Sequence, residues 1–435
     1  MEAEAVGLLR ESYAGKGIVI AELQPEAHPA ILLRVSAALF PPEYLERRAH
    51  YRAFMDEHVF PNEGLLNRED DAAQELIAAL REKARTTGLF APHMPPDAGG
   101  TGDGFLYYAC MNEEIGRSYW AQLVFGCQAP DAGNAEILHL YGTPEQKERF
   151  LEPLVAGRAR SFFSMTEPDV AGSDPTLLRT RAVLDGDEWV IDGHKWFSSG
   201  ADEATFAVVF AISDPDAESH RRGTMILVPA DTPGVDVIGP INVMGHTGRA
   251  WNTHCEVRYT GARVPVENTL GERGAAFRIA QKRLGPGRIH HVMRWLGQMQ
   301  RAFDLMCSYS LEREAFGGPL ADKPTVQNWI ADSAAEIQAC RLLTMDAARK
   351  IDEGSEARVE VSLLKFYAAK ALNDVIDRAI QVHGARGLTD ATPLAQMALH
   401  ARGGRIYDGP DEVHRMVVAR RILKSYAAGN GWQFD

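Results

Sequence analysis

The sequence has few cysteines and no long apolar run, and these absences exclude several classes of protein. Its five cysteines lie far apart and form no CxxC pair in 435 residues. This usage is typical of reduced thiols and not of a disulfide framework or a zinc site. No apolar stretch reaches transmembrane length. The N-terminus lacks a basic segment followed by an apolar one, so no signal peptide is predicted, and we expect a cytoplasmic protein.

Basic charge and several common enzyme motifs are also scarce. The 46 Lys and Arg residues are outnumbered by 59 Asp and Glu residues, and the net charge of −13 argues against a general nucleic-acid binder. An anionic small ligand is not excluded, because one arginine cluster can bind a phosphate on an acidic protein. The patterns GxGxxG, GxxxxGK[ST], HExxH and GxSxG do not occur. A Rossmann dehydrogenase, a P-loop enzyme and an α/β-hydrolase therefore lose support.

The first part of the chain has a helical pattern. Residues 1–42 form a weakly patterned lead-in, and residues 43–160 are predicted to form an N-terminal helical domain. Apolar residues recur there at steps of three and four, which is typical of buried helix faces. The two clearest faces are Tyr51, Phe54, Met55 and Val59, and Leu76, Ala79, Leu80 and Ala84.

Two further helices are predicted near residues 131–141 and 144–156, after a glycine-rich segment at residues 98–102. Thr143 and Gln146 can form a capping box at the start of the second helix, with Pro144 at its first position. A phosphate-binding role for the glycine-rich segment would need a strand before it and a helix after it, so the pattern favours a plain loop.

The middle of the chain, residues 161–272, has the short period of β-strands. Two apolar runs flank Asp185-Gly186, which predicts a hairpin. No long helix interrupts the later strands, so we expect a compact domain with antiparallel pairing. The strands expected after the hairpin are residues 205–212, 225–228, 235–238 and 255–259.

Residues 273–435 return to a helical pattern and are predicted to form a C-terminal four-helix bundle domain. Apolar seams with steps of three and four mark its helices. Two of these seams are Val292, Leu296, Met299, Phe303 and Met306, and Leu364, Ala368, Ala371, Val375, Ala379 and Val382. A long helix is expected over residues 325–352, and a last one over 411–428 that buries Met416, Ala419, Leu423 and Tyr426. The predicted fold class is α+β multidomain, with helical, antiparallel β and helical bundle domains in that order.

A corner before the last helix is a candidate functional site. Asp408 precedes Gly409-Pro410, and the residue before a proline is disfavoured in the α conformation, so the acid lies where a helix cannot continue. Asp411 can cap the new helix, with Glu412 in its first turn. A helix–loop–helix corner with a surface aspartate is the commoner arrangement, so these residues alone do not identify a function.

Three other segments carry groups that can bind a ligand. Residues 166–174 offer hydroxyls and backbone amides to a polar ring edge or a pyrophosphate, or they form an ordinary inter-domain loop. Arg288 follows Gly285-Pro286-Gly287 and is expected at the mouth of a long helix, where it grips a ligand or stays exposed. Arg313 and Phe316 are expected on one face of a helix that ends at paired glycines, where they offer a guanidinium and a ring to a dinucleotide or, as is commoner, form a helix end with a solvated arginine and a core phenylalanine.

Two more features remain ambiguous. His290 and His291 do not form a metal pair, because adjacent residues on a helix point roughly 100° apart, and we expect packing or surface roles for them. Residues 381–387 end a helix at glycines, which permit close backbone approach and equally serve as a plain C-cap.

Taken in this order, the motifs resemble those of the acyl-CoA dehydrogenase family, flavoenzymes that introduce an α,β double bond into acyl-CoA thioesters. The resemblance spans roughly residues 45–430. Residues 166–174 (TEPDVAGSD) are close to the family signature before the β domain, and residues 313–317 (REAFG) are similar to its second hallmark. Residues 283–291 and 408–414 look most like the branch of animal members ten and eleven and their bacterial relatives. Those animal proteins carry an extra kinase-like domain, for which this chain is too short.

The resemblance implies a set of site residues. Asp408 falls where the family has its catalytic glutamate, and it would remove the α-proton while the β-hydrogen leaves as hydride to flavin N5. Ungapped matching to the family places Phe197 and Ser199 beside the flavin. A shift of one residue in this match would place Trp196 and Ser198 there instead. The implied acyl-CoA-binding residues are Ser173, Arg288 and Gly409. The implied FAD-binding residues are Met165, Thr166, Ser173, Phe197, Ser199 and, toward a neighbouring subunit, Arg313, Phe316, Gln381 and Gly384.

The resemblance also implies partners and leaves competing functions open. It implies a homodimer or homotetramer, an electron-transfer flavoprotein as electron acceptor, and a role in fatty acid metabolism through β-oxidation. An acyl-CoA oxidase or a nitroalkane oxidase on the same fold is an alternative, as is a non-catalytic relative, which Asp408 argues against. Pro410 and Pro324 stand where a flavin-contacting Thr and Gln are common, and Arg386 replaces a small residue.

Two effects oppose each other at the carboxyl of Asp408. The N-terminus of the following helix lowers its pKa, whereas an acyl chain that excludes water raises it. We expect the second effect to prevail in the substrate complex, which would bring the pKa of the base toward the working pH.

Overall fold

The structure is a computed structural model that describes residues 39–433, so most of the predicted lead-in lies outside the described residues. The chain divides into two compact units, residues 1–50 and 51–435. In the first unit, the described structure is the beginning of α3 (Pro42–Phe54). All candidate functional residues belong to the second unit. Among the described residues, no helix combines the length and the apolar character needed to cross a membrane.

Short helices and helical turns make up the region after α3. These are η1 (Met55–Val59), η2 (Phe60–Asn62), α4 (Glu63–Leu66), α5 (Asp71–Thr86), η3 (Pro96–Ala98), α6 (Gly104–Ile115), α7 (Ala121–Val124), α8 (Asp131–Tyr141), α9 (Pro144–Gln146), η4 (Lys147–Leu151) and α10 (Glu152–Val155). The predicted helices over residues 131–141 and 144–156 are confirmed. The glycine-rich segment after η3 is a loop, as expected.

The two predicted helix faces in this region have different outcomes. All four residues of the first face, which runs from α3 into η1, are buried, so that face is confirmed. The second prediction is partly wrong, because Ala79 is exposed and Leu76 is half-buried. The buried stripe of α5 is rotated toward Ile77, and its apolar members are Ala73, Ile77, Leu80 and Ala84.

The predicted capping box at α9 is confirmed and has a second role. The Gln146 N–H donates to Thr143 Oγ1 and the Thr143 N–H donates to Gln146 Oε1, both at 3.2 Å, with Pro144 at the first helical position. Gln146 Nε2 also donates to the carbonyls of Glu267 and Thr269, at 2.7 and 2.9 Å. The cap therefore ties this helix to the far end of the β region.

Seven strands form one sheet in the middle of the chain. They are β1 (Ser161–Ser164), β2 (Arg181–Asp185), β3 (Glu188–Ser199), β4 (Phe206–Ile212), β5 (Gly223–Pro229), β6 (Val235–Pro240) and β7 (His254–Pro265). The order is β1-β4-β2-β3-β7-β6, and β5 pairs with β4. Four single turns accompany the strands: η5 (Pro175–Leu177), η6 (Ser219–Arg221), η7 (Ala250–Asn252) and η8 (Val266–Asn268).

The predicted hairpin and the predicted antiparallel pairing are confirmed. Asp185 pairs with Glu188, so Gly186 and Asp187 make the turn between β2 and β3. The pairs β3–β7, β4–β5 and β6–β7 are also antiparallel. Strand β1, which runs parallel to β4, was not among the strands predicted from the sequence. Residues 166–174 therefore follow β1 and lie between two strands of the sheet. The prediction that this segment precedes the β domain is wrong.

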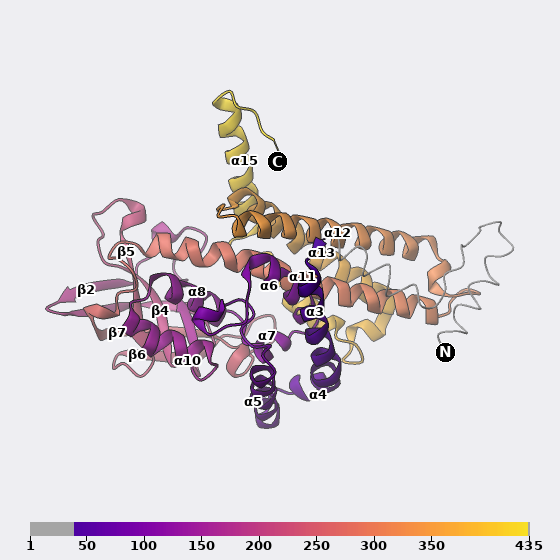
Figure 1. The fold of residues 1–435 in the computed structure, drawn as a ribbon, viewed down its shortest axis with the longest axis horizontal. Coiled ribbons are helices and arrows are strands. Elements are labelled where there is room, and N and C mark those ends of the chain that lie inside the picture. The colour runs from indigo at the N-terminus through magenta and orange to yellow at the C-terminus, as the bar shows by residue number, and fades with distance from the viewer. Residues whose placement is uncertain (1–38, 434–435) are drawn as a thin grey trace. The chain divides into compact units, whose positions relative to one another are not determined.

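Long helices form the C-terminal region: α11 (Ala276–Glu312), α12 (Pro324–Asp352), α13 (Arg358–His383), α14 (Leu394–Gly403) and α15 (Asp411–Ala427), with turns η9 (Leu320–Asp322) and η10 (Gly384–Leu388). Figure 1 shows α11 extending from the sheet into the helices α12 and α13. It contacts β5, α6, α8, α12 and α13. The seam predicted for α13 is fully buried, and so is the seam predicted for α11 except at Phe303.

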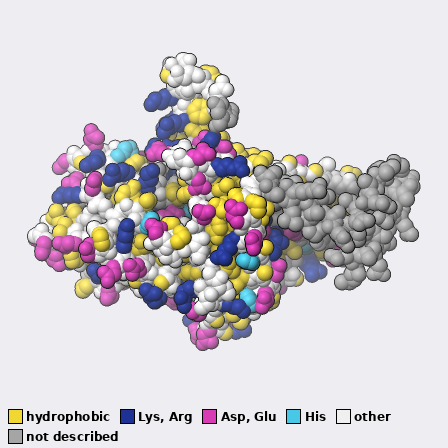
Figure 2. Space-filling view, in the orientation of Figure 1, with side chains coloured by type: hydrophobic (Ala, Val, Ile, Leu, Met, Phe, Trp, Pro, Cys, Tyr) yellow, Lys and Arg dark blue, Asp and Glu magenta, His cyan; other side chains and the backbone are white. Residues whose placement is uncertain are grey.

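The last helix departs from its prediction. Only the beginning of α15 packs on α13, and its buried residues are Asp411, His414 and Val418. The rest projects from the bundle (Figure 1), and Lys and Arg side chains lie along it (Figure 2). The whole predicted seam is therefore exposed in this chain: Met416, Ala419, Leu423 and Tyr426.

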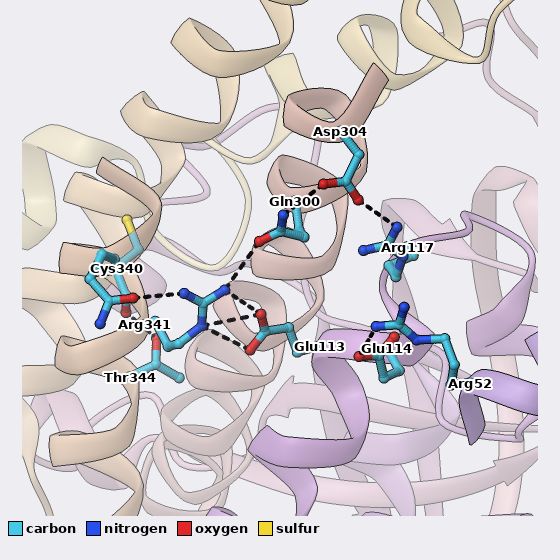
Figure 3. Close-up of polar contacts among 10 residues, drawn as sticks. Arg52, Glu113, Glu114, Arg117, Gln300, Asp304, Cys340, Arg341 and Thr344 are labelled. Carbon is cyan, nitrogen blue, oxygen red and sulfur yellow. Dashed lines mark hydrogen bonds and ion pairs between the residues drawn. The ribbon is translucent and has the colours of Figure 1, made fainter. Parts of the chain in front are cut away.

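A buried ion pair joins α6, α11 and α12 (Figure 3). Arg341 donates to both carboxylate oxygens of Glu113, with N···O distances of 2.5 to 3.2 Å. Gln300 Oε1 accepts from the same arginine at 3.4 Å. One helical turn away, Arg117 donates to Asp304 at 2.7 Å. This network holds α11, which carries several cavity residues, against its neighbours.

Glu113→Ala is expected to lower the free energy of unfolding by about 3–5 kcal/mol, because it breaks a buried ion pair by removing one partner. The matched control is Glu82→Ala, which removes the partner of Arg85 from an exposed pair and should leave stability unchanged. Urea unfolding measures both. Equal shifts of the two midpoints would contradict the assigned role of the buried pair.

Candidate active site

A large cavity lies between the sheet, α11 and the corner that joins α14 to α15. Its volume is about 1620 Å³, above the roughly 300–1,000 Å³ typical of pockets for one small ligand. Residues of the β1–β2 loop, β3 and the β6–β7 loop line one side, and residues of α11 and the α14–α15 corner line the other. The cavity therefore has room for two ligands side by side.

The corner that holds Asp408 is fixed by its backbone. Asp408 has φ +54° and Gly409 has φ +101°, in a region that L side chains rarely adopt. Arg288 Nε donates to the Asp408 carbonyl at 2.8 Å, and His414 Nε2 lies 3.2 Å from the same oxygen. Lys365 Nζ donates to the Gly409 carbonyl at 3.4 Å. Three side chains thus hold a strained turn in one conformation.

Two details of this corner differ from the sequence analysis. Asp411 does not cap α15, because the N-cap is Pro410 and Asp411 is the first helical residue. Its carboxylate instead accepts from Arg405 Nε at 2.8 Å. Arg288 is not at the mouth of a helix, because α11 begins at Ala276 and continues through Pro286. The glycines and proline before Arg288 were misread as a helix start.

The carboxylate of Asp408 is bonded to a histidine that the sequence analysis did not select. His291 Nε2 lies 3.0 Å from Asp408 Oδ2. The His291 ring packs against Tyr407, with centroids 4.5 Å apart. One signal was available: His291 is three residues after Arg288, so both lie on one face of α11. The packing or surface role expected for His291 is therefore incomplete, because the side chain also bonds the Asp408 carboxylate.

Burial and charge act in opposite directions on this pair. Burial acts to raise the pKa of Asp408, but the hydrogen bond from His291 and the positive charges of Arg283 and Arg288 hold that pKa well below its usual range. Burial lowers the pKa of His291 to about 4, with a smaller effect from Arg294. At neutral pH the pair is therefore a carboxylate with a neutral imidazole that donates from Nε2. A carboxylate held in this state can accept a proton.

The opposite side of the cavity presents hydroxyls and an aromatic ring. The β3–β7 register shifts between Lys195 and Ser198, and such a bulge re-aims the side chains of its strand. Phe197 lies in it with φ +51° and lines the cavity with Thr166 and Ser199. Ser198 is fully buried and does not line the cavity. Trp196 lines the cavity as well, so the placement separates Ser199 from Ser198 and leaves both Trp196 and Phe197 beside the cavity.

The loop that carries Thr166 is held by a buried ion pair. Glu167 accepts from Lys195 Nζ at 2.9 Å and from the backbone N–H groups of Arg179 and Thr180 at 2.7 and 2.8 Å. Lys195 Nζ also donates to the Met165 carbonyl at 2.8 Å. Burial lowers the pKa of Lys195 to about 8, although Glu167 opposes this. The exposed ring of Phe197 beside fixed hydroxyls suits a planar heteroaromatic ligand.

Eight of the site residues selected from the sequence meet in this cavity, and four do not. Met165, Thr166, Ser173, Phe197, Ser199, Arg288, Asp408 and Gly409 line it. The other four are exposed elsewhere: Arg313, Phe316, Gln381 and Gly384. The predicted shared helix face of Arg313 and Phe316 is wrong, because α11 ends at Glu312 and Phe316 lies in a turn with φ +52°.

His290 has a structural role that differs from that of His291. Its ring contacts Tyr108 with a centroid distance of 4.7 Å, and its Nε2 lies 3.5 Å from Glu136. Burial is the main cause that lowers the pKa of His290 and raises that of Glu136 to about 8. The packing role expected for His290 is confirmed, and a surface role is excluded.

Comparisons with known proteins cover most of the chain. Residues 41–158, 162–261 and 274–423 match the N-terminal, middle and C-terminal domains of acyl-CoA dehydrogenase. The "probable acyl-CoA dehydrogenase FadE2" of Mycobacterium tuberculosis is 44% identical over 391 residues, which cover 87% of this chain and 95% of that protein. Acyl-CoA dehydrogenase family member 11 of Rattus norvegicus is 41% identical over 86% of this chain, which spans 50% of that longer protein.

A solved structure agrees with the sequence matches. Butyryl-CoA dehydrogenase of Megasphaera elsdenii superposes with a TM-score of 0.78 at 28% identity, over 88% of this chain and 99% of that one. The similarity therefore extends over all three regions of the fold that surround the cavity.

Proposed function

This chain belongs to the acyl-CoA dehydrogenase family, and on that premise we propose that it catalyses the FAD-dependent α,β-dehydrogenation of an acyl-CoA thioester to the trans-2-enoyl-CoA. The family and its fold support an oxidoreductase that acts on acyl-CoA with a flavin, and an oligomeric assembly. The observation that carries the finer proposal is the position of Asp408, whose carboxylate shares one cavity with Thr166 and Ser199.

Asp408 is the proposed base for the α-proton. His291 keeps its carboxylate in one orientation, and Arg288 fixes the backbone that carries it. Bound FAD supplies the acceptor for the β-hydrogen as hydride. The Asp408 N–H donates no hydrogen bond to another described residue. It is therefore available to the thioester oxygen, where negative charge develops as the α-proton leaves.

The proposed ligand-binding residues form three sets. Met165, Thr166, Ser173, Phe197 and Ser199 would hold FAD on the sheet side of the cavity. Ser173, Arg288 and Gly409 would contact the acyl-CoA. The residues outside the cavity, Arg313, Phe316, Gln381 and Gly384, would meet FAD of a neighbouring subunit in a homodimer or homotetramer. Their exposure in the single chain supports this assignment. An electron-transfer flavoprotein is the proposed electron acceptor.

The proposal is tested by anaerobic reduction of the purified protein. A yellow protein with a flavin spectrum is expected to bleach when one of a panel of acyl-CoAs is added, and the enoyl-CoA product is detected by mass spectrometry. A protein without flavin, or one that no acyl-CoA bleaches, would contradict the proposal. Rapid oxygen consumption without an acceptor protein would favour an acyl-CoA oxidase, and bleaching by nitroalkanes alone would favour a nitroalkane oxidase.

A further inference from the structure

Ser199, at the sheet side of the cavity, is bonded to a histidine on the neighbouring strand. Ser199 at the end of β3 pairs with His254 at the start of β7, and Ser199 Oγ lies 2.7 Å from His254 Nδ1. Both residues line the cavity. The His254 ring also approaches Phe197, with centroids 5.9 Å apart. His254 is therefore next to two of the three β3 residues that line the cavity, Phe197 and Ser199.

The direction of this hydrogen bond determines what Ser199 can offer to a ligand. A serine hydroxyl has one proton to donate, and its oxygen can accept other hydrogen bonds at the same time. When His254 carries its proton on Nδ1, it donates to Ser199 Oγ, and the hydroxyl proton is left for the ligand. When Nδ1 is unprotonated, it accepts the hydroxyl proton, and Ser199 can only accept from the ligand.

The surroundings of His254 allow the Ser199–His254 hydrogen bond to run in either direction. Burial lowers the pKa of His254, and His246 adds to this effect, so the ring is neutral at pH 7 and above. The other titratable groups near it are His400 on α14, whose pKa burial lowers to about 4, and Glu69, whose carboxylate is 2.9 Å from His246 Nε2. Among the described residues, no side chain bonds His254 Nε2 and fixes one tautomer.

We propose that His254 is a positioning residue that acts through Ser199: it sets whether the Ser199 hydroxyl donates to or accepts from the reactive ring nitrogen of the flavin. This inference rests on the proposed function, which brings FAD to Ser199. Oxidised flavin has an unprotonated N5 that needs a donor, and reduced flavin has an N5–H that needs an acceptor. The Ser199–His254 pair serves both states when His254 exchanges its ring proton with water between Nδ1 and Nε2 and the Ser199 hydroxyl turns between the flavin and Nδ1, with no movement of the backbone.

Sulfite is the probe, because it adds to N5 of oxidised flavin and bleaches its visible absorbance without any acyl-CoA. His254 strengthens Ser199 as a donor, since linked hydrogen bonds polarise one another. His254→Phe keeps a ring and removes both nitrogens, and it is expected to weaken sulfite binding by about five- to tenfold, the effect of one hydrogen bond. His254→Asn places a polar atom where Nδ1 lies and is expected to restore the dissociation constant to within about threefold of the unsubstituted enzyme.

A double-mutant cycle separates action through Ser199 from a general disturbance. In the Ser199→Ala background, His254→Phe is expected to change the sulfite dissociation constant by less than about twofold. An equal loss with and without the hydroxyl would overturn the proposal, as would a His254→Phe enzyme with unchanged sulfite affinity. His254→Asn keeps the test available if His254→Phe does not fold. A His254→Asn enzyme that binds sulfite more weakly than the unsubstituted enzyme by more than about threefold would also overturn the proposal. A protein that purifies without flavin contradicts the proposed function, whereas a yellow protein without the coupling contradicts this inference alone.

Discussion

Asp408→Asn is expected to slow anaerobic bleaching of the flavin by acyl-CoA by about 10²–10⁴-fold, the usual loss on removing a general base. The protein should remain yellow, because the residues assigned to FAD lie on the other side of the cavity. Asn is the appropriate substitute, because it tolerates the φ of +54° at this position better than Ala does. Stopped-flow absorbance with saturating acyl-CoA measures the rate.

The control for Asp408→Asn is Glu412→Gln, which removes an exposed negative charge from the first turn of α15, the helix that follows the Asp408 corner. Its bleaching rate should stay within about twofold of the unsubstituted enzyme, because exposed charges interact weakly. Asp408→Glu keeps a carboxylate and is expected to retain part of the bleaching rate. The part of the rate that is lost measures the effect of moving the carboxylate by one methylene group. Bleaching of Asp408→Asn at the unsubstituted rate would show that another group removes the α-proton.

Local sequence signals predicted the elements whose formation depends on neighbouring residues. The capping box at Thr143 and Gln146, the Asp185-Gly186 hairpin and the α13 seam are all present in the structure. The residues of the capping box and of the hairpin turn lie within a few positions of one another, and successive members of the α13 seam lie three or four positions apart. The short strand β1 was missed because its partner, β4, lies more than forty residues further along the chain, and a parallel pairing leaves no turn signal.

Predictions failed where the outcome depended on what covers a helix. The apolar stripe of α5 was placed about one residue away, because several Ala and Leu positions satisfy the same spacing. The seam of α15 has the correct period, but Met416, Leu423 and Tyr426 are exposed in the part of the chain that the structure describes. Gly285-Pro286 was taken as a helix boundary, yet α11 continues through both residues. Periodicity defines a face, but it does not supply the neighbour that buries that face.

Of the two residues in the Asp408–His291 pair, only Asp408 was identified from the sequence. Asp408 was selected through the resemblance, and its corner position follows from Gly409-Pro410. His291 was not selected, because its bond to Asp408 joins residues 117 positions apart. The role of His254 was hidden for the same reason, since it depends on the register between β3 and β7. Contacts of this kind arise only from the tertiary fold.

His291→Leu is expected to raise the pKa of Asp408 and to make the reaction sensitive to acid. The pKa of Asp408 is held low by the His291 hydrogen bond, and a hydrogen bond to a charged group contributes about 1.5–3 kcal/mol, or roughly one to two pKa units. The base works only when ionised, so its ionised fraction falls as the pH drops through the raised pKa. The acid limb of the kcat/KM profile should therefore lie about one to two pH units higher in the variant than in the unsubstituted enzyme. Between pH 8 and pH 5, kcat/KM of the unsubstituted enzyme should change little.

The two kinetic profiles of the unsubstituted enzyme test the opposing effects at Asp408. The profile of kcat/KM reports the free enzyme, in which His291 keeps the pKa low, and the profile of kcat reports the substrate complex. An acyl chain that excludes water is expected to move the second ionisation up into the range of about pH 5–8. A kcat profile with no ionisation in that range would contradict this expectation.

Two variants separate the hydrogen bond of His291 from its bulk. His291→Gln keeps an N–H donor on a side chain that can reach Asp408 Oδ2, so its kcat/KM profile should lie closer to that of the unsubstituted enzyme than the His291→Leu profile does. His290→Gln alters the adjacent histidine, which contacts Tyr108 and Glu136 and not Asp408. That variant is expected to be less stable but to keep the acid limb where it is. If His290→Gln and His291→Leu moved the acid limb equally, the shift would come from disturbed packing of α11, and the His291–Asp408 bond would not be its cause.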